Sequence, residues 1–177
     1  MFFNLILLNN LYLDMNGVPQ FRYNSVKTCG DIEFSNDDAT VKKKGGNVSS
    51  TVLGDNVMSV GVYEWEVEIT EMNGSYICIG AINAKNDWNV KQDNYTSAMC
   101  VCSDSCAYGM NRQDGNIAMV KGDVINFVMD FDQAKFTATG PNNKYVYFAN
   151  GLKGNEYVAF LGFASGSSYQ LTMRGKG

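Results

Sequence analysis

One stretch decides the fold class of this chain, Gly61-Val-Tyr-Glu-Trp-Glu-Val-Glu-Ile-Thr70. Large apolar side chains occupy every second position, and carboxylates occupy the positions between them: Tyr63, Trp65, Val67 and Ile69 against Glu64, Glu66 and Glu68. Successive side chains of a β-strand point to opposite faces of its sheet. The stretch therefore predicts a strand with one face in the core and one in water, whose glutamates pair with cross-strand Lys or Arg rather than bind a cation.

A second inward row lies in Lys121-Gly-Asp-Val-Ile-Asn-Phe-Val-Met-Asp-Phe131, formed by Ile125, Phe127, Met129 and Phe131. Asp132-Gln133 then predicts a turn into Lys135-Phe-Thr-Ala-Thr139. From Asp31 onward, short apolar runs alternate with clusters of Gly, Asn, Asp and Ser, and no helix-length pattern is clear after residue 15. We expect an all-β protein with little helix, an antiparallel β-sandwich of two packed sheets.

The composition excludes several classes of function. The chain has 177 residues, a net charge of −4 and only 14 Lys and Arg, so a nucleic-acid partner is not expected. It contains no histidine, which removes the commonest general base and the Ser-His and Cys-His nucleophile pairs. We therefore expect a protein that is not an enzyme, and catalysis by carboxylates alone is the least favoured alternative.

The cysteines indicate free thiols in a cytoplasmic protein. Five are present: Cys29, Cys78, Cys100, Cys102 and Cys106. Cys100-x-Cys102-x3-Cys106 offers three thiols, but zinc prefers four ligands, so neither a metal nor another cofactor is expected. The apolar start Met1–Leu8 lacks a positive flank and is too short to span a bilayer, so no membrane partner is expected. We expect residues 1–30 to be an extension that packs on a domain of residues 31–174.

Several segments together resemble one family. The Gly-x-Tyr-x-Trp-Glu-Val-Glu strand precedes a Gly-Asp-Val-Ile strand, and four more pieces fit the same order: Asp31–Val41, Ile77–Ala81, Lys135–Thr139 and Tyr157–Phe163. In this order they resemble the SPRY domain, a β-sandwich that binds peptides and proteins. The resemblance covers roughly residues 30 to 174.

The loop from Asn83 to Tyr95 embeds Trp88 and Tyr95 among polar residues, which is typical either of a contact anchor or of a side chain that folds back on the sandwich. The resemblance implies that this loop, the hairpin tip 44–49 and the segment 163–167 gather at one edge of the sandwich as a shallow peptide site. The implied ligand-binding residues are Lys44, Asn47, Asp87, Trp88, Asn94, Tyr95, Tyr108, Phe163, Ser165, Gly166 and Ser167.

The resemblance implies a non-enzymatic module for a protein or peptide ligand, part of a larger complex as an adaptor or a ubiquitin-ligase substrate receptor. The alternative is a lectin-like sandwich, because the fold is similar to that of concanavalin-type lectins. The Asn, Asp and aromatic residues of the loops also suit a sugar.

Overall fold

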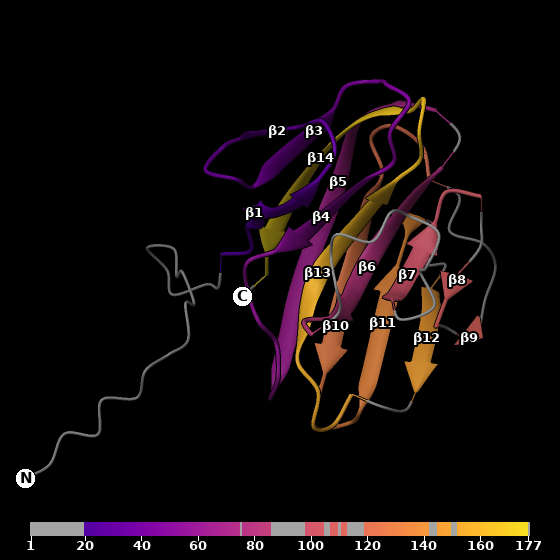
Figure 1. Cartoon of the computed structure of the whole chain (residues 1–177). Coiled ribbons are helices and arrows are strands. Elements are labelled where there is room, and N and C mark those ends of the chain that lie inside the picture. Colours follow the sequence, from indigo (N-terminus) through magenta and orange to yellow (C-terminus); the bar gives the residue numbers. More distant parts are fainter. Residues whose placement is uncertain are drawn as a thin grey trace, which may run out of the picture.

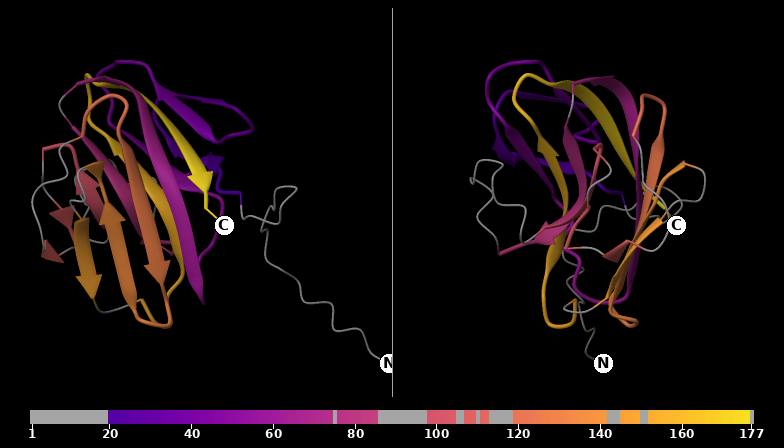
Figure 2. Two further views of the ribbon diagram at one scale, coloured as in Figure 1. Left: turned by 180° about the vertical axis from the view of Figure 1, so that it is seen from behind. Right: turned by 90° about the vertical axis from the view of Figure 1, so that its right-hand side faces the viewer.

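Two antiparallel sheets packed face to face make up the protein (Figures 1 and 2). The structure is a computed structural model that describes residues 20–74, 76–85, 98–104, 107–109, 111–112, 119–141, 145–149 and 152–176. Within these ranges there is no α-helix, and hence none long and apolar enough to cross a membrane. The prediction of an all-β sandwich is confirmed.

The first sheet has six strands, in spatial order β1 (Tyr23–Cys29), β4 (Ser50–Gly54), β13 (Tyr157–Phe163), β6 (Ile77–Asn83), β7 (Ala98–Cys102) and β8 (Ala107–Tyr108). The second has eight, in the order β2 (Ile32–Ser35), β3 (Thr40–Lys43), β14 (Ser168–Gly175), β5 (Val62–Asn73), β10 (Val124–Asp130), β11 (Lys135–Thr139), β12 (Tyr145–Ala149) and β9 (Asn111–Arg112). Neighbours in both sheets are mostly far apart in the chain, so tertiary pairing sets the order.

The alternating strand lies at the centre of the core, as predicted. Trp65, Val67 and Ile69 of β5 are fully buried, and Tyr63 is partly buried against the same cluster. Trp65 stacks on Phe21, Phe127 and Phe136 with ring centroids 5.4, 5.2 and 5.7 Å away. The second predicted row, on β10 and in the turn after it, is also buried: Ile125, Phe127, Met129 and Phe131.

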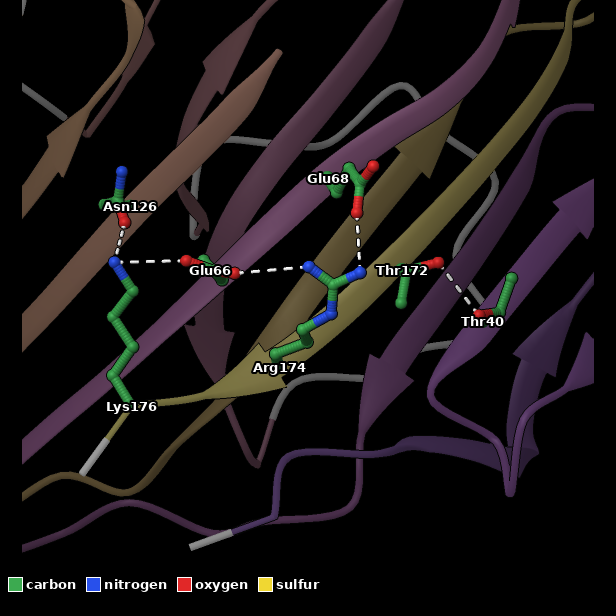
Figure 3. A network of polar contacts seen from close by, with 7 residues as sticks. All are labelled: Thr40, Glu66, Glu68, Asn126, Thr172, Arg174 and Lys176. Carbon is green, nitrogen blue, oxygen red and sulfur yellow. Dashed lines mark hydrogen bonds and ion pairs between the residues drawn. The ribbon is translucent and has the colours of Figure 1, made fainter. Parts of the chain in front are cut away.

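The opposite face of β5 carries the glutamates and their cationic partners (Figure 3). Arg174 of β14 bridges Glu66 and Glu68, at 3.4 and 2.7 Å, and Lys176 reaches Glu66 at 3.1 Å. The β5–β14 register places Arg174 directly opposite Glu66. This confirms the expected pairing for Glu66 and Glu68, and such partly exposed ion pairs contribute at most about 1 kcal/mol each.

The start of the described chain belongs to the sandwich. β1 pairs with β4, and the expected boundary at residue 31 falls after this strand. The polar sequence of β1, Tyr-Asn-Ser-Val-Lys-Thr-Cys, has no period-two pattern, so it does not predict a strand by itself. Phe21 and Tyr23 belong to the core.

The central strands of the six-stranded sheet, β4, β13, β6 and β7, are buried on both faces. Its inner face joins the main core, and its outer face carries a second group of buried side chains, here called the outer cluster: Leu53, Cys78, Ile82, Ala98, Cys100, Cys102, Val158 and Phe160. A solvated outer face would alternate buried and exposed positions, whereas β13 is buried at all seven.

The prediction of five free thiols was wrong for two of them. Cys78 and Cys102, which are 24 positions apart in the chain, form a disulfide with their Cα atoms 4.2 Å apart. The physical reason is the register of β6 and β7, which places the two residues directly opposite each other on the outer face. Cys29 and Cys100 are free thiols.

Candidate functional site

Two loops meet at the end of the sandwich that is uppermost in Figure 1, and together they form what we call the loop end, residues 44–49 and 164–167. The first loop connects β3 to β4, and the second connects β13 to β14. The amide of Gly166 donates a hydrogen bond to the carbonyl oxygen of Gly46. Gly166 has a positive φ of 72°, which suits glycine at this turn. The structure therefore brings together two segments that the sequence analysis predicted to be neighbours.

A buried lysine supports the loop end from below. Lys43 is 1% exposed, and its ammonium group donates a hydrogen bond of 2.9 Å to the carbonyl oxygen of Ser167. Desolvation lowers the pKa of Lys43, and the charge of Asp31 partly opposes that shift. The buried ammonium thus fixes the start of β14 against the end of β3.

The middle residue of the run Lys42-Lys-Lys44 is buried, although a run of like charges usually faces solvent. Lys42 is half-buried and pairs with Glu71, and Lys44 is exposed and pairs with Glu33. Lys43 follows the inward-facing Val41 by two positions on β3, so it shares the inner face. The sequence signal that was missed is this period-two relationship to Val41.

Four of the predicted site residues are exposed at the loop end. They are Lys44, Asn47, Ser165 and Gly166. Phe163 and Ser167 are buried: the Phe163 ring packs against Tyr169, and the Ser167 hydroxyl donates to the carbonyl oxygen of Ala164. These two side chains shape the loop from inside, and the exposed surface comes from the residues around them.

Tyr108 connects to the same end through a residue that the sequence analysis did not single out. The hydroxyl of Tyr76 lies 3.1 Å from that of Tyr108, and the carbonyl oxygen of Tyr76 accepts the amide of Ala164. Tyr108 lies on β8, at the edge of the six-stranded sheet, and is 37% exposed. Tyr76 therefore links the edge of this sheet to the loop 164–167.

The remaining predicted site residues lie outside the described part of the chain. They are Asp87, Trp88, Asn94 and Tyr95. Their role stays a prediction, and the choice between a contact anchor and a packed Trp88 stays open.

A shallow hollow of about 310 Å³ lies at the opposite end of the sandwich. Loops before β5, after β10 and before β13 line it with Ser59, Val60, Phe131, Asp132, Lys153 and Gly154. None of these residues was predicted as a site. The loops that line the hollow lie at the other end of the strands from the loop end (Figure 1).

The sequence matches no family model, and no curated protein matches it either. Solved structures, in contrast, do match its fold. The SPRY domain of human HERC1 superposes with a TM-score of 0.66 at 16% identity, covering 86% of this chain and 97% of that one. The PSpry domain of TRIM65 gives a TM-score of 0.62, also at 16% identity, over 87% of this chain and 91% of that one.

The chain has a SPRY-like fold. The coverage extends over nearly the whole of each solved domain, so the described sandwich corresponds to a full SPRY fold rather than to part of one. At 16% identity the likeness is one of fold, and it confirms the resemblance on which the sequence analysis relied.

Proposed function

We propose that this SPRY-like domain is a non-catalytic recognition module that binds a peptide or protein segment at its loop end. The observation that carries the proposal is the joining of the two loops, by the Gly166 to Gly46 hydrogen bond and by Lys43 beneath Ser167. A surface that is ordered before binding loses less conformational entropy when a ligand arrives. The loop end has this property without any ligand.

The chemistry of the loop end suits a polypeptide ligand. A Cβ atom placed on Gly45, Gly46 or Gly166 would meet no other atom within 4 Å, so a ligand backbone can approach the loop backbones closely. Val48 is 48% exposed and offers an apolar contact beside them. Lys44, whose side chain is 65% exposed and pairs with Glu33, offers an ammonium group that an acidic ligand residue can share. Backbone hydrogen bonds with one apolar and one charged contact are typical of peptide recognition.

Protein or peptide binding is also what SPRY domains generally do, which supports the same class of ligand. A domain of this kind serves as the recognition part of an adaptor or of a ubiquitin-ligase substrate receptor. We propose that role within a larger complex.

The test is selection of peptides from a random 12-residue phage-displayed library on the immobilised wild-type domain. Selected peptides are then measured by fluorescence polarisation against a Val48→Asp, Ser165→Arg double variant, which places charge and bulk on both loops. We expect the double variant to weaken binding at least about tenfold, since a few central contacts dominate interface energy.

The matched control is Val60→Asp at the opposite end, where the side chain is 73% exposed. It should leave the affinity unchanged. If Val60→Asp and not the double variant weakens binding, the site lies at the hollow rather than at the loop end. A glycan array run in parallel tests the lectin-like alternative, which requires retention of a glycan together with failure of every peptide selection.

A further inference from the structure

Three cysteine sulfurs gather on the outer face of the six-stranded sheet. Cys78 of β6 lies opposite Cys102 of β7, and Cys100 lies two positions before Cys102 on the same face. The three Sγ atoms all lie within 4.8 Å of one another, and all three side chains are fully buried. One disulfide needs only two of these sulfurs. The third sulfur, that of Cys100, is a free thiol next to the pair.

The residue of β6 that lies opposite Cys100 is a glycine. Gly80 pairs with Cys100 in the β6–β7 register. A Cβ atom at Gly80 would lie 2.9 Å from the Cys100 Cβ and 2.0 Å from the carbonyl oxygen of Met99. A side chain at this position would therefore force β7 away from β6. Glycine allows the close approach that brings Cys100 beside the other two sulfurs.

The surroundings combine apolar walls with hydrogen-bond donors to sulfur. Side chains of the outer cluster enclose the sulfurs with Leu53, Ile82, Ala98, Val158 and Phe160. The Tyr76 hydroxyl donates to the Cys102 sulfur at 3.5 Å, and the backbone amide of Tyr108 donates to the Cys100 sulfur. Metal-bound thiolates in proteins are stabilised by donors of this kind, which offset the negative charge of sulfur.

We propose that the reduced form of this protein binds one Cu(I) ion through the sulfurs of Cys78, Cys100 and Cys102. Thiolate sulfur is the soft ligand that Cu(I) prefers, and Cu(I) accepts a trigonal set of three. Zinc prefers four ligands, and the described residues bring only these three together. The site differs from the Cys100, Cys102 and Cys106 set considered from the sequence, because Cys78 comes from the neighbouring strand.

Metal binding and the disulfide exclude each other. A dithiol reductant transfers two electrons and two protons to the Cys78–Cys102 disulfide, which becomes two thiols while the reductant becomes its own disulfide. Cu(I) then forms bonds to sulfur, releases the proton of each thiol that becomes a thiolate, and keeps its oxidation state. For Cu(I) to reach the buried sulfurs, the sheet must open locally. The edge strand β8 (Ala107–Tyr108) pairs with β7 over only two residues, so opening is easiest there.

The experiment uses the full chain, reduced with a dithiol and desalted without oxygen. Cu(I), supplied as its acetonitrile complex, is titrated against the coloured chelator bathocuproine disulfonate. We expect the reduced wild type to retain one Cu(I) per chain. The wild type with its disulfide intact lacks two of the three sulfur ligands, and the Cys100→Ala variant lacks one. Each should therefore bind Cu(I) at least about tenfold less tightly than the reduced wild type. Copper X-ray absorption should show three sulfur neighbours in the wild type and two in Cys100→Ala.

The matched control is Cys29→Ser, which alters a half-buried thiol on β1 and should bind as the wild type does. Cys106→Ser is tested beside it. Equal retention of Cu(I) by the oxidised and the reduced wild type would overturn the proposal. This comparison needs no variant, so it remains decisive if Cys100→Ala does not fold. Retention by Cys100→Ala equal to the wild type, or a loss with Cys106→Ser alone, would also overturn it.

Discussion

The ammonium group of Lys43 donates a hydrogen bond to the carbonyl oxygen of Ser167, which lies 124 positions later in the chain. This contact joins the end of β3 to the loop before β14, directly beneath the exposed residues Ser165 and Gly166. A buried charge is costly unless it is paired or hydrogen-bonded, so the contact holds the loop in one place. The order of the loop end therefore depends on a side chain buried beneath its exposed surface.

Lys43→Met tests this dependence. Methionine keeps the length of the side chain and removes the charge, so the lost hydrogen bond is partly offset by the removed desolvation cost and global stability changes little. The Gly166 amide should exchange with solvent at least about tenfold faster in hydrogen-exchange measurements, which corresponds to about 1.4 kcal/mol of local stability. Lys42→Met, on the other face of β3, is the control. An unchanged Gly166 exchange rate in Lys43→Met would mean that the lysine does not hold the loop.

Trp65→Ala should lower the free energy of unfolding by about 3–5 kcal/mol, because it removes a fully buried ring that stacks on three others. Chemical denaturation measures the change. The exposed neighbour Glu64 provides the control, and Glu64→Ala should stay within about 0.5 kcal/mol of wild type. Similar values for the two variants would contradict the inward register of β5.

Reduction of the Cys78–Cys102 disulfide should destabilise the fold. The disulfide joins cysteines 24 positions apart, and closing a loop of this length stabilises the fold by about 3 kcal/mol through the unfolded chain. For a protein of this size that corresponds to a fall of roughly 6–12 °C in the thermal midpoint. Scanning calorimetry with and without a metal-free reductant measures it, and Cys78→Ala should lose its sensitivity to reductant. A midpoint that reductant leaves unchanged would restore the earlier expectation of free thiols.

Alkaline pH should destabilise the protein through Tyr23. Burial raises the pKa of Tyr23 above its ordinary value of 10.0, and its hydroxyl has no hydrogen-bond partner in the described structure. The unfolded tyrosine ionises near pH 10 while the folded one stays neutral, so this stability is complete below pH 10 and is lost above it. The loss is about 1.4 kcal/mol per pH unit.

Tyr23→Phe should remove this part of the alkaline loss and leave stability at pH 7 unchanged or slightly higher, since the hydroxyl is unpaired. Unfolding free energies from pH 7 to 11.5 measure it for both proteins. Burial also raises the pKa of Cys100 to about 12, from an ordinary 9.0, so a smaller slope that starts near pH 9 should remain in Tyr23→Phe. Parallel curves for the variant and the wild type would show that Tyr23 does not contribute.

The candidate site was predictable where the chain itself brings residues close. Ser165 and Gly166 are adjacent in sequence, and a polar, glycine-containing turn before a strand indicates an exposed loop. That this loop meets Gly46 followed from the family resemblance and not from any local pattern. Tyr76 was not found, because its links to Tyr108 and Ala164 exist only after β6, β8 and β13 have assembled.

The sequence by itself determined the class of the fold and the faces of its central strands. Alternation from Tyr63 to Ile69 is a local property, since adjacent side chains on any strand must point to opposite sides, and it placed Trp65 in the core without knowledge of the partner strands. Only the tertiary structure decided which residues meet across strands. Cys78 faces Cys102, and Lys43 reaches Ser167, because strand order and register bring together residues far apart in the chain, and no local pattern specifies them.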